Sequence, residues 1–200
     1  MLLHDKLKEY RLILASQSPR RRQLLTDAGI EFVLAPRFEC DESFPATMPA
    51  EQVAEYLSCL KADAYPEPLG DKDILLTADT VVIADGKVLG KPKDRAEAVA
   101  MLEQLSGREH QVVTGVSLTN ASTRHSFSAL SRVKFRTLSR EEIEYYVDNY
   151  RPFDKAGSYG IQEWIGYVGI EGIEGSFYNV MGLPVQRVYC ELKEFVGLVE

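Results

Sequence analysis

The chain has 200 residues, with 23 Lys+Arg against 30 Asp+Glu, and therefore a formal net charge of −7. A composition of 45% hydrophobic and 26% charged residues excludes a disordered chain and is typical of a globular protein. The acidic balance argues against a broad nucleic-acid-binding surface, so we expect no nucleic-acid partner. It leaves room for a small polyanion bound in one local basic pocket.

The cysteines and the first ten residues indicate the compartment. Cys40, Cys59 and Cys190 are odd in number and share no C-x-x-C spacing, which argues against a disulfide framework or a zinc site and favours a reducing compartment. No charge-free run reaches the roughly 18 apolar residues that a membrane span needs. Residues 1–10, MLLHDKLKEY, introduce charge too early for a secretory signal. We therefore expect a cytoplasmic protein with no membrane partner.

The N-terminal part predicts a strand followed directly by a capped helix. Residues 12–15 form a short apolar run, which indicates a buried strand. Ser18 is a favoured N-cap residue and Pro19 a favoured first helical residue. Gly29 marks the end of this helix.

Hydrophobic periodicity predicts the remaining elements of a mixed α/β fold. Strands are expected at 31–35, 74–84, 87–89, 111–118 and 127–136, and helices over 51–64, 94–105, 139–147 and 183–195. Residues 36–49, which contain three prolines, and 65–70 are expected to be loops. No internal repeat or low-complexity linker interrupts this order, so we expect one domain.

Short motifs place the turns and helix starts. Asp85-Gly86 predicts a hairpin turn. Asp94 with Glu97, and Ser139 with Glu142, match the capping box that opens a helix.

Four glycines recur at every third position: Gly166, Gly169, Gly172 and Gly175. Four units without proline cannot form a collagen helix. The spacing predicts a bulged hairpin or a mobile loop.

The strand–loop–helix over residues 12–28 is the first candidate site. Free N–H groups and the dipole at a helix start favour an anion, and Ser16 and Ser18 add hydroxyl donors. Arg20–Arg22 add charge, and the planar fork of arginine suits phosphate oxygens. The alternative is a capped surface helix with solvated arginines. The segment is not a Walker A loop, because no G-x-x-x-x-G-K-[ST] occurs in the chain.

Asp79 is the second candidate, because it interrupts a run that otherwise predicts a buried strand. A lone carboxylate costs several kcal/mol there unless it is paired or bound to a metal. Asp79 is therefore either structural, capping a turn before Thr80, or functional. We expect it at the end of the strand, where α/β folds form crevices.

A carboxylate cluster, Glu39, Asp41 and Glu42, lies in the proline-rich loop. Alone it is typical of a solvated surface. Together with Asp79 it offers the hard oxygen ligands that Mg²⁺ prefers.

For two lysines and one tyrosine the sequence allows both a structural role and a role in the site. Lys61 falls among the apolar positions of its helix, so it either extends to water or points into a cleft. Lys91 is either a turn residue or a site residue, and Tyr159 is either core or pocket lining. Three histidines show no metal-ligand spacing: His4, His110 and His125.

These motifs together resemble a known family, the Maf-like nucleoside triphosphate pyrophosphatases. Residues 16–21, SQSPRR, are similar to its S-x-S-P-R-R signature. Further blocks follow in family order: Asp41-Glu42, Lys61-Ala62, 78–82, 90–92, 114–116, 154–157, 159–162, 175–180 and 182–184. The series covers roughly residues 12–190.

The resemblance implies an α/β fold with a long mixed sheet, in which one domain over residues 1–200 forms two lobes around a central cleft. It implies a relation to the inosine-triphosphate pyrophosphatase fold. It also implies hydrolysis of a nucleoside triphosphate to monophosphate and pyrophosphate, a divalent metal cofactor (Mg or Mn) and a homodimer. A nucleotide-binding regulator of cell division, with incidental hydrolysis, is the alternative that the family suggests.

The resemblance also assigns roles position by position. Asp79 is expected to be the proton acceptor, Glu42 and Asp79 to hold the metal, and Lys61 and Lys91 to complete the catalytic set. The expected substrate-binding residues are Ser16, Ser18, Arg20, Arg21, Thr80 and Gln162.

Three of these positions bear on the base. The family branch acting on dTTP and UTP typically has Arg, Thr and Gln where this chain has Arg20, Thr80 and Gln162. The branch acting on 7-methyl-GTP has a bulky aromatic residue, Gln and Glu there. A Gln amide offers both a donor and an acceptor to a uracil or thymine edge, whereas a glutamate only accepts. The chain departs from the common pattern in Trp164, close after the Gln, and in a longer segment before Leu12.

Overall fold

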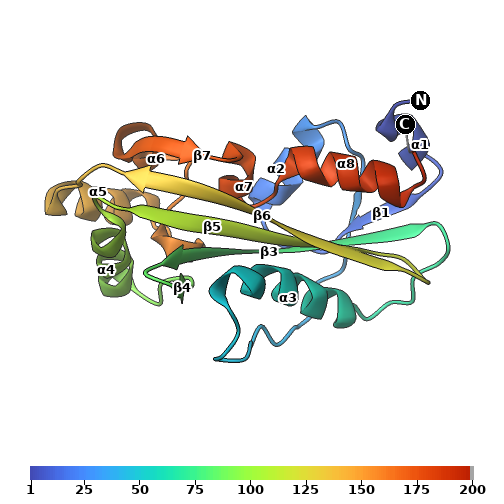
Figure 1. Cartoon of the computed structure of the whole chain (residues 1–200), viewed down its shortest axis with the longest axis horizontal. Coiled ribbons are helices and arrows are strands. Elements are labelled where there is room, and N and C mark those ends of the chain that lie inside the picture. Colours follow the sequence, from blue (N-terminus) through green and yellow to red (C-terminus); the bar gives the residue numbers. More distant parts are fainter. Residues whose placement is uncertain (199–200) are drawn as a thin grey trace. The chain divides into compact units, whose positions relative to one another are not determined.

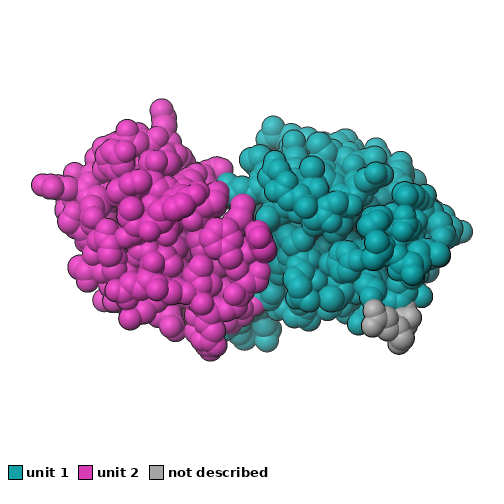
Figure 2. Space-filling view, turned by 90° about the horizontal axis from the view of Figure 1, so that it is seen from above, with its two compact units in different colours: residues 1–79, 114–129, 182–200 teal, residues 80–113, 130–181 magenta. Residues whose placement is uncertain are grey.

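The computed structural model describes residues 1–198. The chain divides into two compact units, which Figure 2 distinguishes by colour. Unit 1 comprises residues 1–79, 114–129 and the segment from Gly182 to the C-terminus, and unit 2 comprises residues 80–113 and 130–181. Three long strands contribute residues to both units.

Helices and strands alternate along the chain, which confirms the α/β class (Figure 1). The strands are β1 (Arg11–Leu14), β2 (Val33–Leu34), β3 (Asp73–Ala84), β4 (Lys87–Leu89), β5 (Glu109–Thr119), β6 (Arg124–Phe135) and β7 (Ile170–Glu174). The helices are α1 (Leu3–Leu7), α2 (Pro19–Asp27), α3 (Ala50–Asp63), α4 (Arg95–Leu105), α5 (Arg140–Tyr150), α6 (Trp164–Gly169), α7 (Phe177–Met181) and α8 (Val185–Phe195), with a 3₁₀ turn η1 (Ala156–Ser158).

The strands form a seven-stranded sheet in the order β2-β1-β3-β5-β6-β7, with β4 paired to β3. Strand β1 runs parallel to both β2 and β3. The β3–β4 and β6–β7 pairs are antiparallel, so the sheet is mixed, as the resemblance implies.

Unit 1 packs helices on both faces of its strands. Figure 1 shows α3 on one side of the strands, and α2 and α8 on the other. One apolar cluster of this unit joins β1, β3 and α3 through Ile13, Ala15, Ala62 and Leu75. Ser18 caps α2 by accepting the Arg21 N–H at 3.4 Å, as predicted, and Pro19 begins the helix.

Unit 2 has its own apolar cluster, formed by β3–β6, α4, α5 and the segment from Tyr159 to Ile165. The largest fully buried side chains in it are Tyr146 and Phe135. The hairpin predicted at Asp85-Gly86 joins β3 and β4, and both residues have the positive φ of 50° and 71° that such a turn requires.

Both predicted helix starts of unit 2 are present. Ser139 and Glu142 form a complete capping box on α5, because each side chain accepts the other residue's backbone N–H. Asp94 caps α4 by accepting the Glu97 N–H at 2.8 Å. The Glu97 carboxylate accepts the Lys93 N–H instead of the Asp94 N–H, so this box is only half formed.

The prediction of a bulged hairpin or mobile loop over residues 166–175 is wrong. The segment forms helix α6 and then strand β7, which pairs with β6. Glycine costs about 1 kcal/mol in a helix relative to alanine, and tertiary packing outweighs that cost here. Ile165 is 1% exposed and Trp164 packs against the same core.

No helix among residues 1–198 combines the length and apolar character that crossing a membrane requires.

Candidate active site

Asp79 and Lys61 form the centre of the polar cluster in unit 1. Thr77 and Asp79 lie two residues apart on β3, so they share one face of the strand. Helix α3 covers that face, and Ser58 and Lys61 are one helical turn apart on it. The Ser58 carbonyl accepts the Thr77 hydroxyl at 2.7 Å, and Lys61 Nζ donates to Asp79 Oδ1 at 2.5 Å.

Glu42 joins this ion pair from the proline-rich loop. Its Oε1 lies 3.3 Å from Lys61 Nζ, so one ammonium group stands between two carboxylates. The Lys61 and Asp79 side chains are 16% and 13% exposed, whereas Glu42 is 50% exposed. A charge as buried as Asp79 requires a partner, and Lys61 supplies it. Asp79 contacts this ammonium group through one of its two carboxylate oxygens.

Asp79 does not lie at the end of its strand, contrary to the prediction. Strand β3 continues to Ala84 because Val81, Val82 and Ile83 are buried apolar residues that extend it into the hairpin. Unit 1 nevertheless ends at Asp79 and unit 2 begins at Thr80, so the residue marks a boundary within the strand.

Arg21 is the most deeply placed cation of the α2 start. Its Nε donates to the Gly182 carbonyl at 2.7 Å and its Nη1 to the Ala78 carbonyl at 2.8 Å. Nη1 also lies 3.3 Å from the hydroxyl oxygen of Ser16. Burial lowers the pKa of the Arg21 guanidinium, while Asp79 counteracts this shift. Arg21 thus fixes the backbone on the N-terminal side of Asp79.

The other predicted groups at this helix start lie closer to the surface. Ser16 and Ser18 are half-buried, and the Ser16 hydroxyl accepts the Ser18 N–H at 3.2 Å. Arg20 is half-buried one residue before Arg21. The structure therefore brings Ser16, Ser18 and Arg21 together in one hydrogen-bonded group within unit 1.

Cys40 lies near Lys61, Glu42 and Asp79, although the sequence predicts no site role for it. It is a free thiol, two residues before Glu42 in the same loop. Burial raises the pKa of the Cys40 thiol, and Lys61 acts against that shift. Its position two residues before Glu42 is the sequence feature that could have predicted its place near the site.

Unit 2 contains Thr80, Lys91 and Gln162. The Gly157 N–H donates to the Gly90 carbonyl at 3.1 Å, which joins the segment before Gln162 to the residue preceding Lys91. Gly157 has a φ of 68°, and a Cβ there would lie 2.9 Å from the Val82 side chain, so the contact requires glycine. Lys91 is exposed, and Thr80 and Gln162 are half-buried.

A second ion-paired lysine lies near Gln162 and has no assigned role in the sequence analysis. Lys155 is 8% exposed and contacts Asp154 at 2.8 Å and Glu163 at 3.2 Å. Lys155 lies in the family block 154–157, but the segment has no periodicity, so hydrophobic patterning does not predict that its charge is buried.

The described carboxylates fit a metal only in combination with other ligands. No group of three or more His, Cys, Asp or Glu side chains within residues 1–198 is arranged to hold a metal ion. Mg²⁺ is commonly bound by one or two carboxylates together with substrate phosphates. Glu42 and Asp79, on either side of Lys61, provide such a pair of carboxylates.

Comparisons with known proteins cover nearly the whole chain. A family model described as Maf-like protein matches residues 11–195. A Bacteroides thetaiotaomicron protein named dTTP/UTP pyrophosphatase is 54% identical over 188 residues, which are 94% of this chain and 97% of the relative. A Porphyromonas gingivalis protein of the same name is 54% identical over 193 residues, which are 96% and 97% of the two chains.

One solved structure, described as that of a HAM1 protein from Coxiella burnetii, aligns with 92% of this chain and 99% of its own. The alignment has a TM-score of 0.46 and 15% identity. The expected relation to the inosine-triphosphate pyrophosphatase fold, like the expected central cleft, stays a prediction. The family model and the two relatives lead to a firmer statement: the chain belongs to the Maf-like family.

Proposed function

We propose that this protein hydrolyses dTTP and UTP to the nucleoside monophosphate and pyrophosphate. The observation that carries this proposal is the name shared by relatives about half identical over nearly the full chain, dTTP/UTP pyrophosphatase. Arg20, Thr80 and Gln162 match the residues expected in that branch of the family. The proposal extends to modified pyrimidine nucleotides with the same base edge.

Asp79 is the proposed proton acceptor. A water molecule attacks the α-phosphorus, its proton passes to Asp79, and the bond from the α-phosphorus to the bridging oxygen breaks to release pyrophosphate. Lys61 holds Asp79 Oδ1 at 2.5 Å, and this contact supports a base with a fixed position. A carboxylate with an ordinary pKa near ~3.9 is a weak base for water, so electrostatic stabilisation must supply much of the catalysis.

A divalent cation, Mg or Mn, is the proposed cofactor, and Glu42 and Asp79 would hold it. When bound, such a cation stabilises phosphate charge and lowers the pKa of a bound water. Lys61 contributes a second positive charge between the same two carboxylates.

The triphosphate is proposed to bind at the start of α2. Ser16 and Ser18 supply hydroxyl groups, and Arg20 and Lys91 supply charge for phosphate oxygens. Arg21 is proposed to add a further positive charge to this site, while its Nε and Nη1 hold backbone carbonyls.

We propose a cytoplasmic homodimer as well, on the resemblance to the family alone. Sedimentation of the purified chain would measure the mass of the assembly, and a monomer at micromolar concentration would contradict this part of the proposal.

A panel of triphosphates tests the activity. The protein would be incubated with Mg²⁺ and dTTP, UTP, CTP, GTP, ATP or 7-methyl-GTP, and pyrophosphate and orthophosphate would be measured separately. We expect pyrophosphate and monophosphate, with dTTP and UTP preferred. Orthophosphate as the product would overturn the reaction, and preference for a purine would overturn the base assignment.

A further inference from the structure

Helix α3 carries Lys61 and packs on the strands of unit 1 through apolar side chains. Val53, Ala54 and Leu57 are all buried on this helix. Apolar burial is non-directional, so it holds a helix against a sheet without fixing its position along its own axis. Because Lys61 lies near the end of α3, the place of its ammonium group depends on that axial position.

One buried polar contact ties the helix to β3. The Thr77 hydroxyl donates to the Ser58 carbonyl at 2.7 Å, and both residues are fully buried. A backbone carbonyl has two lone pairs, so it can accept this hydroxyl in addition to a helical N–H group. A hydrogen bond is directional and weakens steeply when its geometry is lost. This contact therefore fixes α3 along its axis.

The contact lies next to the Lys61–Asp79 ion pair on both elements. Asp79 is two residues beyond Thr77 on β3, which is about 7 Å along the strand. Lys61 is three residues beyond Ser58 on α3, which is about 4.5 Å along the helix. The hydrogen bond and the ion pair thus join the same two elements in the same order, so a shift of α3 at Ser58 also moves Lys61 relative to Asp79.

A close backbone contact at Gly115 sets the height of the helix above the sheet. A Cβ added at Gly115 on β5 would lie 2.2 Å from the Glu55 nitrogen and 2.3 Å from the Ala54 carbonyl carbon, which are backbone atoms of α3. Only glycine permits this approach. Ser126 on β6 also donates to Glu55 Oε1 at 2.7 Å. The start of α3 is therefore held by β5 and β6, and the turn that precedes Lys61 is held by Thr77.

We propose that Thr77 is a positioning residue that acts on the reaction through Lys61. Its hydroxyl holds α3 where the Lys61 ammonium group reaches Asp79, and so keeps the proposed base in contact with its cation. Thr77 is fully buried beneath the helix and contributes no atom to the reaction itself. This inference rests on the proposed function, because it assigns a role in the same site.

The test is Thr77→Val, which keeps the shape of the side chain and removes the hydroxyl. We expect kcat for dTTP to fall about tenfold, since a misplacement of ~1 Å can cost up to ~100-fold in rate. KM should change less than about twofold, because the residues at the start of α2 are untouched. Thr77→Ala should show a similar loss of kcat, and Thr77→Ser, which keeps the hydroxyl, should stay within about twofold of the wild type.

A Lys61→Met background shows whether the effect passes through Lys61. Adding Thr77→Val to Lys61→Met should change kcat by less than about twofold, because the contact that Thr77 positions is already lost. Thr26→Val is the matched control, since the Thr26 hydroxyl also donates to a helix carbonyl, that of Arg22 at 2.9 Å, but on the exposed side of α2. This control should keep the wild-type kcat and KM.

Urea denaturation would first show which variants are folded under the assay conditions. Folded Thr77→Val and Thr77→Ala proteins with the wild-type kcat would overturn the inference while the proposed function stands. An equal loss of kcat from Thr77→Val in the wild-type and Lys61→Met backgrounds would also overturn it. A wild type that releases no pyrophosphate from these nucleotides would overturn both.

Discussion

Lys61 in unit 1 and Lys155 in unit 2 each contact two carboxylates. The two groups differ in how many oxygens of the better-buried carboxylate, Asp79 or Glu163, have a partner in the protein. Lys61 lies 2.5 Å from Asp79 and 3.3 Å from Glu42, and Lys155 lies 2.8 Å from Asp154 and 3.2 Å from Glu163. The lysine side chains are 16% and 10% exposed.

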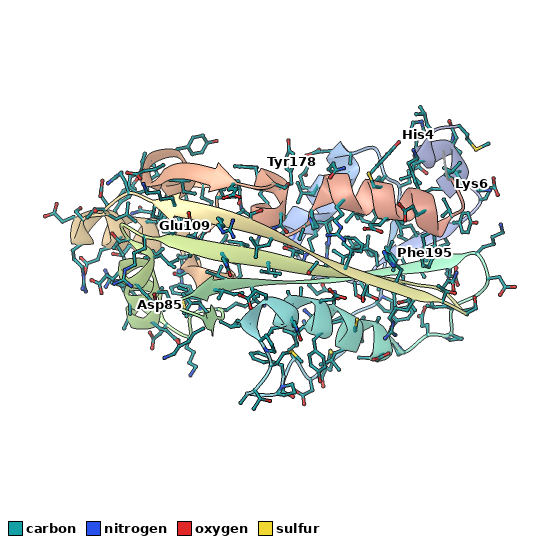
Figure 3. All side chains as sticks on the ribbon, viewed as in Figure 1. His4, Lys6, Asp85, Glu109, Tyr178 and Phe195 are labelled. Atoms are coloured by element: carbon teal, nitrogen blue, oxygen red, sulfur yellow. The ribbon has the colours of Figure 1, made fainter. Side chains whose placement is uncertain are left out.

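The two groups differ in the contacts made by Asp79 in the first and by Glu163 in the second. Lys61 uses only Oδ1 of Asp79, whereas Glu163 has Lys155 on one oxygen and Tyr146 on the other. The second oxygen of Asp79 is therefore available to water or a cation, whereas each oxygen of Glu163 already has a partner. The two groups have equal composition and similar burial and differ in how fully the protein holds their carboxylates. Figure 3 shows side chains with nitrogen and oxygen atoms along the whole ribbon, and surface ion pairs such as Arg95 with Asp148 occur far from either group in the sequence, so ion pairing alone identifies neither group.

Among the changes that compare the two groups, the largest effect is expected from removing the positive charge of Lys61. Lys61→Met leaves Asp79 and Glu42 without their shared cation, so turnover of dTTP should fall about 10²–10³-fold. Steady-state release of pyrophosphate measures this. Lys72→Met, a change at a lysine of unit 1 that is 63% exposed, is the control and should keep wild-type turnover. Equal activity in the two variants would show that Lys61 is only structural.

Arg21→Lys tests whether the backbone around Asp79 is held in place by the guanidinium group of Arg21, which donates to the Gly182 and Ala78 carbonyls. Lysine cannot reach the Gly182 and Ala78 carbonyls together, so the free energy of unfolding should fall by about 2–4 kcal/mol. Urea denaturation of the variant and of the exposed control Arg37→Lys would measure the loss. A stable Arg21→Lys protein with weaker triphosphate binding would show that Arg21 binds substrate without supporting the fold.

A pH effect should distinguish unit 2 from unit 1. Burial lowers the pKa of His110 from 6.5 to about 4, and its Nε2 lies 2.6 Å from the Tyr159 hydroxyl. Because the unfolded chain binds this proton more readily, His110 contributes its full stability above pH 6.5 and loses it as the pH falls toward 4. Between pH 7 and 5 the loss should be about 2 kcal/mol.

His110→Gln, neutral at every pH, should flatten this decrease in urea-unfolding experiments. A variant whose stability falls as steeply as that of the wild type between pH 7 and 5 would remove His110 as the cause.

The smallest effect is expected at the cap of α5. Ser139→Ala removes one half of the capping box and should cost about 1 kcal/mol of unfolding free energy. Thermal unfolding of the variant and the wild type measures this loss, and a variant as stable as the wild type would show that the cap adds nothing to the stability of α5.

Local sequence signals account for much of the fold. Ser18 and Pro19, the capping box at Ser139, and Asp85-Gly86 all form what they predict, because each depends on a few neighbouring backbone groups. Helix α6 was not predicted, since core packing of Ile165 outweighs its glycines.

The candidate site was predictable in its residues and not in its contacts. Lys61 is conspicuous because it interrupts an apolar helical stripe, and Asp79 because it interrupts an apolar strand. Lys155 and Glu163 lie in an irregular segment and contact each other, and the contact of Glu163 with Tyr146 depends on the tertiary packing of α5. No spacing in the sequence expresses that packing.

Asp79→Asn tests the central claim most directly. The amide keeps the size of the carboxylate and cannot accept the proton, so pyrophosphate release from dTTP should fall by about 10³-fold or more. Binding of a non-hydrolysable dTTP analogue should stay within a few-fold of the wild type, and Asp148→Asn on the surface should behave as the wild type. Near-normal turnover by Asp79→Asn would contradict the assignment of the base.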